Sequence, residues 1–368
     1  MKKKTFSKLL ISLFAVAVVA TGCSSGGSES KPEKKTVEGV PDKIAKDDQV
    51  KIMVVRKIGG DDHTAQFLAG AKQEGTSMGF TVDTFSANGD TVKFHDAISQ
   101  ALEKDYDGFI ISHGDDAATV EDVKKITAKG IPVVAFDSNP DLKNVDGVTL
   151  TSQDDENLAK LALTQMNEEL KGQGNIIYLW VDGFPPMVRR MAVYKDFLAA
   201  NSGIKEVERF GIASGDVSVQ TQNAVSAMLT KHKKGEISAI FATWDAFAIG
   251  AARAVKEAGR DEIKIYGIDV SNADLQMMQE DKSPWVSTAA VDPKVIGQVD
   301  VRMLAKKIAG EDVPQTYDLA ATLITQDKLK SAAESINMVN LAAVLPGWGV
   351  SDAFEEDWMK NLKEAYAK

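Results

Sequence analysis

The sequence is poor in cysteine and histidine and has no surplus of basic residues. Its 368 residues include one cysteine and four histidines, and its 53 acidic residues outnumber its 43 basic ones. A single cysteine excludes an intrachain disulfide framework and a cysteine-rich zinc module. The net charge of -10 argues against a nucleic-acid partner and against docking on anionic lipid, because both require a basic surface.

Motifs for catalysis and for tightly bound cofactors are also missing. The sequence has no G-x-S-x-G elbow, no H-E-x-x-H helix and no Walker phosphate loop. Gly172 and Gly174 precede a predicted strand instead of following one, so they do not form a dinucleotide-binding loop. The histidines are scattered, without the spacing of a metal site. We therefore expect no catalytic residue, no cofactor and no metal ion.

The N-terminal residues have the pattern of an export signal. Lysines at positions 2–4 and 8 precede an apolar run over residues 9–20, which is too short to span a membrane in the ordinary way. Small residues then lead to Cys23 and a Ser/Gly tract. This pattern resembles a bacterial lipobox, which implies that Cys23 is the lipid attachment site and the first residue of the mature chain. The alternative is a buried free thiol.

Processing at this site changes the protein that has to fold. Removal of residues 1–22, which carry four lysines and no acid, leaves 346 residues and lowers the net charge from -10 to -14. Residues 23–49 are predicted to be a lipidated, flexible tether, because they are rich in Ser, Gly, Pro, Lys and Glu. We expect an extracytoplasmic monomer that contacts the membrane only through its lipid, with its folded part starting near Val50.

From Lys51 onward, short β-branched segments alternate with amphipathic ones, which is typical of βαβ units on a parallel sheet. The predicted strands cover residues 51–55, 80–85, 108–112, 131–136, 175–179, 207–212, 239–243, 263–268 and 285–290. Nine strands are too many for one small domain. The predicted fold class is therefore α/β, with two doubly wound parallel-sheet lobes joined by hinge strands.

An internal similarity supports two like lobes. Residues 108–139 and 238–272 each give a strand, a turn with an acid, a helix ending at a glycine and a second strand ending in Asp. Chance similarity between two βαβ units is the alternative. Ligands bind beyond the carboxyl ends of parallel strands. The repeat puts Asp137 and His113 there in the first half, and Asp269, Trp244 and Asp245 in the second.

These residue types suit a polyol. Carboxylates accept hydrogen bonds from hydroxyl groups, and an aromatic face such as that of Trp244 stacks on a sugar ring. For Asp137 and Asp269 the alternative role is a helix N-cap. Further candidates follow other strands, with surface ion pairing, packing or exposure as their alternatives: Arg190, Trp180, Phe184, Lys57, His63 and Thr64. Arg189 is predicted to make a surface ion pair.

Seven segments, in order, carry a family resemblance: KIMVVRKIGGDDHTAQFLAGAKQEG, DGFIISHGDDAATV, IPVVAFDSN, RRMAVYKDF, SAIFATWDAFAIGAARAV, IYGIDVSN and AAVDPKVIG. Over residues 50–325 the chain resembles the ribose-, galactose- and xylose-binding proteins of bacterial ABC transporters, of the type I periplasmic binding protein fold. The resemblance implies sugar contacts at Lys57, His63, Thr64, His113, Asp137, Arg190, Trp244, Asp245 and Asp269. An aromatic pair usual in the family is replaced by His63 and Thr64, which implies that the stacking aromatic has moved to Trp244.

We therefore predict a receptor that binds a neutral monosaccharide or polyol between its lobes and delivers it to an ABC permease and its ATPase. The first lobe is predicted to span residues 50–152 and 292–317, and the second 153–291 and 318–368. A receptor for a nucleoside or a furanone-like signal is one alternative, and a lipoprotein that only senses is another. A secreted hydrolase that uses Asp137 and Asp269 is the third.

Overall fold

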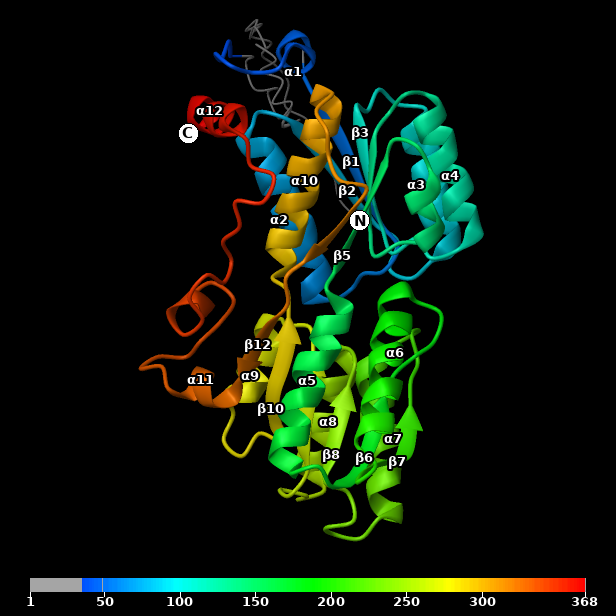
Figure 1. Cartoon of the computed structure of the whole chain (residues 1–368), viewed down its shortest axis with the longest axis vertical. Coiled ribbons are helices and arrows are strands. Elements are labelled where there is room, and N and C mark those ends of the chain that lie inside the picture. Colours follow the sequence, from blue (N-terminus) through cyan, green and yellow to red (C-terminus); the bar gives the residue numbers. More distant parts are fainter. Residues whose placement is uncertain (1–34, 48, 368) are drawn as a thin grey trace, which may run out of the picture. The chain divides into compact units, whose positions relative to one another are not determined.

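The computed structural model describes residues 35–47 and 49–367, so the predicted export signal and Cys23 lie outside the described residues. Its strands form two six-stranded sheets, each of which defines a lobe with the helices that pack on it (Figure 1). The first sheet has the order β11-β5-β4-β3-β1-β2 and is parallel throughout. Its strands are β1 (Lys51–Arg56), β2 (Thr81–Ser86), β3 (Gly108–Ser112), β4 (Val133–Phe136), β5 (Val148–Gln153) and β11 (Thr316–Leu319).

The second sheet has the order β12-β10-β9-β8-β6-β7 and is parallel except for the pair β10 and β12. Its strands are β6 (Gly174–Leu179), β7 (Ile204–Phe210), β8 (Ala239–Ala242), β9 (Lys264–Ile268), β10 (Trp285–Ala290) and β12 (Thr322–Thr325). All nine predicted strands are present and the α/β class is confirmed. The sequence analysis missed β5, β11 and β12, because each mixes polar with apolar residues and lacks the continuous apolar run of β4 and β8.

Helices cover both faces of each sheet, and the apolar side chains between the layers form the cores. The first lobe has α2 (Asp62–Ser77) and α10 (Pro293–Ala309) on one face and α3 (Thr91–Leu102) and α4 (Ala117–Ala128) on the other. The second lobe has α5 (Asp155–Leu170) and α6 (Pro185–Ala200) on one face, and α7 (Val217–Lys231), α8 (Asp245–Glu257), α9 (Asn272–Gln279) and α11 (Gln326–Lys330) on the other.

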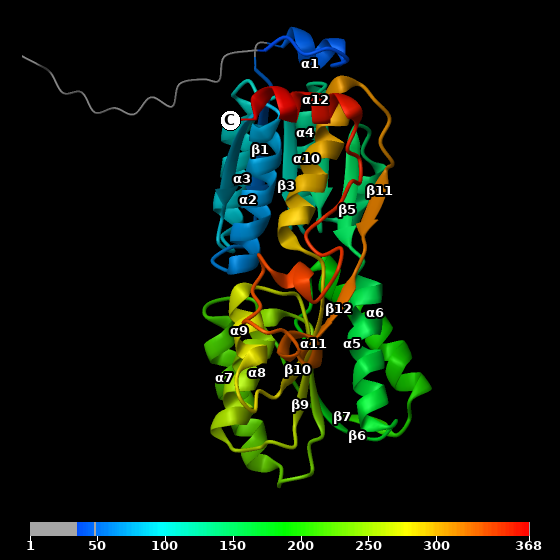
Figure 2. The ribbon, with the colours of Figure 1, turned by 90° about the vertical axis from the view of Figure 1, so that its left-hand side faces the viewer.

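The chain passes between the lobes after β5, after β10 and after β11. It also crosses at its C-terminal end, where we expected residues 318–368 to stay with the second lobe. Leu341 and Trp348 pack in the second-lobe core, but Trp358 and Met359 of α12 (Asp357–Tyr366) pack in the first. Figure 2 shows α12 beside α10 of the first lobe. The apolar face of α12 meets the first lobe, and Lys363 of α12 pairs with Glu74 of α2 at 2.6 Å.

The folded part also begins earlier than Val50. The short helix α1 (Asp42–Lys46) buries Ile44 in the first-lobe core, with 6% of the residue exposed. The expectation of a flexible tether up to residue 49 is therefore wrong for α1. Within residues 35–47 and 49–367, no helix combines the length and apolar character needed to cross a membrane.

Candidate functional site

A pocket of about 610 Å³, including the part open to solvent, lies between the carboxyl ends of the two sheets. Its lining comes from both lobes. The first lobe contributes Arg56, Ile58, Asp61, His63, His113 and Gln153, and the second contributes Val181, Phe184, Pro186, Met187, Arg190, Ala213, Trp244 and Asp269. Each residue lies at or just beyond a strand end or in the first turns of a following helix, where parallel sheets bind their ligands.

The first-lobe wall is organised by Arg56, the last residue of β1. Its guanidinium is buried and lies over the ring of Phe67, 4.8 Å from the centroid. It donates hydrogen bonds to Thr64 Oγ1 at 3.1 Å, to Ser112 Oγ at 3.1 Å and to His63 Nδ1 at 3.2 Å. All three partners are uncharged, and burial lowers the pKa of Arg56 to about 10.

These contacts decide where the proton of one histidine lies. A guanidinium only donates hydrogen bonds, so Nδ1 of His63 accepts and the ring proton is on Nε2. Ser112 Oγ accepts from Arg56 and also lies 2.9 Å from Nδ1 of His113, an interaction that both tautomers of His113 allow. Burial, followed by the Arg56 charge, lowers the pKa of both histidines, so both rings are neutral near pH 7. His63 therefore offers its Nε2–H as a donor.

Two buried atoms of this wall have no partner within the described residues. They are Nε2 of His63, a donor, and Oε1 of Gln153, an acceptor. Gln153 is the last residue of β5, where the chain leaves the first lobe. Buried polar atoms are nearly always hydrogen-bonded, so a donor and an acceptor left open in one pocket indicate a polar ligand.

The second-lobe wall is mostly apolar. Six of its eight lining residues are Val181, Phe184, Pro186, Met187, Ala213 and Trp244. They come from three places: the β6–α6 turn with the start of α6, the segment after β7, and the residue before α8. Trp244 packs edge-on against Phe247, with ring centroids 5.6 Å apart.

Arg190 and Asp269 form the charged end of the second-lobe wall. The Arg190 guanidinium donates to the Thr243 carbonyl at 2.5 Å and to Asp155 at 2.8 Å, and it lies 3.4 Å from each Asp269 oxygen. Burial alone would lower the pKa of Arg190, but Asp269 and Asp155 together raise it. The arginine is therefore charged and held in place by two carboxylates.

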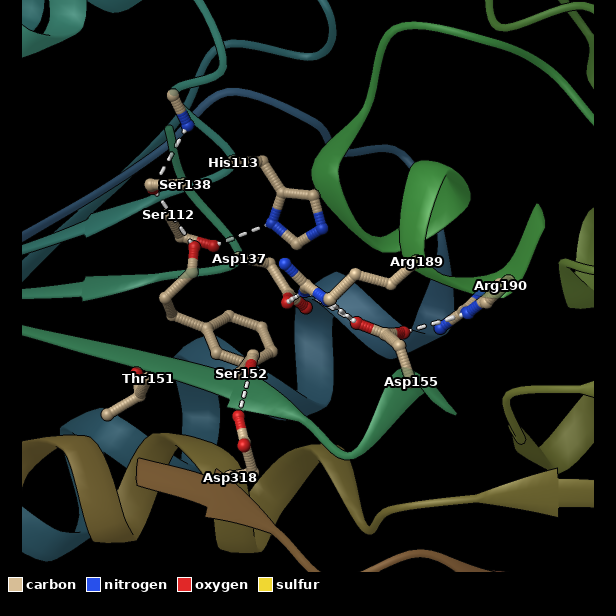
Figure 3. Close-up of polar contacts among 12 residues, drawn as sticks. Ser112, His113, Asp137, Ser138, Thr151, Ser152, Asp155, Arg189, Arg190 and Asp318 are labelled. Carbon is tan, nitrogen blue, oxygen red and sulfur yellow. Dashed lines mark hydrogen bonds and ion pairs between the residues drawn. The ribbon is translucent and has the colours of Figure 1, made fainter. Parts of the chain in front are cut away.

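Arg189, the neighbouring residue on α6, joins the two lobes (Figure 3). It lies 2.7 Å from Asp137 of the first lobe and 2.5 Å from Asp155 of the second. Asp137 is buried, and burial together with Asp155 raises its pKa to about 7. The expectation of a surface ion pair for Arg189 is therefore wrong, because its partners are fully buried carboxylates from both lobes.

Three residues that follow the strands have left-handed backbones, with φ of 62° at His113, 46° at Asp137 and 76° at Asp269. Neither aspartate is a helix N-cap, since Asn139 and Ser271 have that role. Non-glycine residues rarely adopt such angles, and they concentrate at functional sites.

Of the eleven predicted contact residues, six line the pocket: His63, His113, Phe184, Arg190, Trp244 and Asp269. Five do not. Lys57 and Asp137 form ion pairs, with Asp115 and Asp116 and with Arg189 respectively. Thr64 accepts a hydrogen bond from Arg56, and Trp180 donates one to the Met187 carbonyl. Asp245 lies beside Asp274. The pocket residues that the sequence analysis missed are Arg56, Ile58, Asp61, Gln153, Val181, Pro186, Met187 and Ala213.

Asp245 and Asp274 are a buried pair of carboxyl groups in the second lobe. Burial, together with Asp274, raises the pKa of Asp245 well above its ordinary value, and burial raises that of Asp274 to about 7. The two carboxyl groups thus favour a shared proton. Among the residues that the structure describes, no group of three or more histidine, cysteine, aspartate or glutamate side chains is placed to bind a metal ion.

Comparisons with known proteins agree with this geometry. Residues 52–312 match the family described as periplasmic binding protein domain. A crystal structure of a sugar ABC transporter protein from Yersinia enterocolitica is 47% identical, with a TM-score of 0.86, and is covered over 90% of this chain and 100% of that one. The chain belongs to the periplasmic binding protein family.

Two further relatives have named ligands. A solute-binding protein of a 5-methylthioribose transporter from Thermotoga lettingae, solved with 5-methylthioribose, is 32% identical with a TM-score of 0.81, over 86% of this chain and 99% of that one. A D-ribose/D-allose-binding protein from Pseudomonas aeruginosa is 29% identical over 72% of this chain and 81% of its own length.

Proposed function

We propose that this protein is the receptor of an ABC importer and captures a neutral sugar or polyol in the pocket between its lobes. The observation that carries the proposal is the set of polar groups that converge there: the His63 Nε2 donor and the Gln153 Oε1 acceptor, which have no partner within the described residues, together with His113 and the Arg190–Asp269 pair. Sugar hydroxyls both donate and accept hydrogen bonds, so one ring satisfies such a mixed set. The sugars named for the relatives support the same class of ligand.

Binding from both walls would stabilise the closed arrangement of the lobes, which a permease then recognises. Two polar contacts already join the lobes. They are Arg189 with Asp137, and the Asn272 backbone N–H, which donates to Asp62 at 3.1 Å. A ligand adds further contacts across the same gap and shifts the population toward closure.

The membrane attachment and the partners are part of the proposal. Cys23 carries a lipid, the mature protein is an extracytoplasmic monomer, and the partners are a permease with its ATPase. Replacement of Cys23 by Ser is expected to release the protein from the membrane fraction without a change in ligand affinity. A loss of affinity in that variant would contradict the anchor role.

Isothermal titration of the mature protein with D-ribose, D-allose, allitol and adenosine tests the ligand class, and small-angle scattering with each ligand tests closure. Micromolar or tighter binding of a sugar or polyol, with compaction, is the expected result. Binding of adenosine alone would favour the nucleoside alternative, for which Trp244 offers a stacking surface. Binding without compaction would contradict the closure mechanism.

We propose no catalytic role for the carboxylates. A hydrolase that uses Asp137 and Asp269 needs both side chains at the ligand, and Asp137 pairs with Arg189 outside the pocket lining. Recovery of the bound sugar unchanged after prolonged incubation is the expected result, and its conversion would favour the hydrolase.

A further inference from the structure

The two walls of the pocket differ in their chemistry. On the first-lobe wall, five of the six lining residues are polar: Arg56, Asp61, His63, His113 and Gln153. On the second-lobe wall, six of the eight are apolar, and Arg190 and Asp269 are the two polar ones. The aromatic faces of Phe184 and Trp244 can stack on the C–H face of any sugar ring, but the aliphatic side chains of Val181, Pro186, Met187 and Ala213 leave a hydroxyl that faces them without a partner.

An unpaired hydroxyl in such a place is costly. Moving a hydroxyl from water to an apolar surface without a new hydrogen bond is unfavourable, whereas a methyl or thioether group gains from the same move. Met187 and Trp244 are themselves suited to such groups, since thioether sulfur and aromatic faces are polarizable. The apolar wall therefore selects against a hydroxyl and for an apolar group at the end of the ligand that faces it.

A nucleobase matches this wall less well than a small apolar group does. A nucleobase would place amide and ring nitrogens against Val181, Pro186, Met187 and Ala213, whose side chains cannot hydrogen-bond. Those polar edges would be buried without partners, and that disfavours a nucleoside.

We infer that the ligand is a pentose-sized sugar with a small apolar substituent, its hydroxyls toward the first lobe and its substituent against the apolar wall of the second. This inference rests on the proposed function, since it names the substrate class of that same pocket. The substituent replaces a terminal hydroxyl, and Arg190 with Asp269 holds the hydroxyls nearest to it.

Three sugars that differ at carbon 5 test the inference by isothermal titration: 5-methylthioribose, 5-deoxyribose and D-ribose. The first two lack a 5-hydroxyl and therefore share the five-membered ring. They differ only in the methylthio group, so comparing their affinities isolates the effect of the substituent from the effect of ring size. We expect 5-methylthioribose to bind at least tenfold tighter than 5-deoxyribose, because a sulfur and a methyl group are buried. Equal affinity of these two, or tighter binding of D-ribose, would overturn the inference and leave the sugar receptor intact. If no sugar or polyol binds, both the inference and the proposed function fail.

A matched pair of variants locates the substituent. Val181→Thr keeps the shape of a wall residue and adds a hydroxyl, and it should weaken 5-methylthioribose about threefold to tenfold relative to D-ribose. Val188→Thr is the control, because Val188 lies on α6 with 52% of the residue exposed and does not line the pocket. An unchanged ratio of the two affinities in Val181→Thr, with the fold intact by circular dichroism, would contradict the placement against this wall.

Discussion

The repeated units of the two lobes share a backbone and differ in side chains. In each, a strand leads into a polar turn and a helix, and the next strand ends in an aspartate with a left-handed backbone: Asp137 at φ 46° and Asp269 at φ 76°. Beyond the preceding strand, the first lobe brings His113 to the pocket, directly after β3, and the second brings Trp244, two residues after β8. The repeat therefore fixes where side chains reach the pocket, while their identity gives each wall its own chemistry.

The same contrast holds for the two buried arginines. Arg56 of the first lobe donates to uncharged groups and its pKa is lowered by burial, whereas Arg190 of the second lobe lies between two carboxylates that raise its pKa. Arg56 thus orients neutral donors, and Arg190 is part of a buried ion network. Substitutions of these arginines and of the repeated aspartates test whether the two lobes differ in function as they do in structure.

The largest effect is expected for Arg190→Ala. The change leaves Asp269 buried without its cation and Asp155 with Arg189 alone, and breaking a buried ion pair typically costs about 3–5 kcal/mol. The free energy of unfolding, measured by urea denaturation, should fall by this amount, and sugar binding should be lost. The control is Arg209→Ala, since Arg209 pairs with Glu206 at the surface. A stability loss in Arg190→Ala no larger than that of the control would contradict the network.

A second effect distinguishes the two repeated aspartates by pH. The pKa of Asp137 is about 7 in the folded state against an ordinary value of 3.8, so between pH 4 and pH 7 the folded protein holds a proton that the unfolded chain has lost. Stability from this group is therefore present at low pH and is lost as pH rises toward 7. The free energy of unfolding of the wild type, relative to Asp137→Asn, should fall by roughly 2 kcal/mol over this range, below the upper limit of about 4 kcal/mol that the full shift would give.

Urea denaturation at a series of pH values measures this difference. The titration belongs to the pair of Asp137 and Asp155, with Arg189, Arg190 and Arg56 as the charges around it. Asp269→Asn provides the comparison from the other lobe. A wild-type curve that stays parallel to that of Asp137→Asn from pH 4 to pH 7 would contradict the raised pKa.

Ligand affinity should depend on Asp269 and not on Asp137, whereas the pH dependence of stability depends on Asp137. Asp269 lines the pocket, and loss of a charged hydrogen bond to a hydroxyl costs about 1.5–3 kcal/mol, so Asp269→Asn should weaken sugar binding at least tenfold. Asp137 pairs with Arg189 outside the lining, and because an asparagine oxygen still accepts a hydrogen bond from Arg189, Asp137→Asn should change affinity by less than about threefold. Titration calorimetry at pH 8 measures both, and equal losses would mean that Asp137 reaches the ligand on closure.

The sequence predicted the residues that the repeat places beyond strand ends, and it missed those whose role depends on packing. His113, Trp244 and Asp269 follow apolar strands and were found from that position alone. Arg56 and Gln153 are the last residues of their strands. From sequence alone, a polar residue at a strand end that lines a pocket looks the same as one that lies in a hinge. Apolar lining residues such as Met187 have the same pattern as core residues.

The sequence also could not predict which residues contact each other in the folded protein. Adjacent arginines on α6 differ by about 100° in direction, so Arg190 faces the second-lobe network while Arg189 reaches Asp137 across the gap. The position of α12 likewise depends on tertiary structure, because its apolar face packs on the first lobe after the chain has left the second lobe. The local sequence pattern predicts that such residues are buried, but the tertiary structure decides which residues they pack against.

The smallest effect is expected for Arg56→Lys, which tests whether the first-lobe wall works through oriented imidazoles. A lysine keeps the charge, but its single ammonium cannot reproduce the planar fork that holds Thr64, Ser112 and His63 together. We expect a loss of affinity of about fivefold, roughly 1 kcal/mol, and a mixture of His63 tautomers in place of the Nε2-protonated form. Nitrogen chemical shifts of the His63 ring report the tautomers directly, which a general loosening of the fold would not change in this specific way. If the tautomers stay as in the wild type while affinity falls, then Arg56 acts on the ligand itself, and the two lobes would each hold it with an arginine.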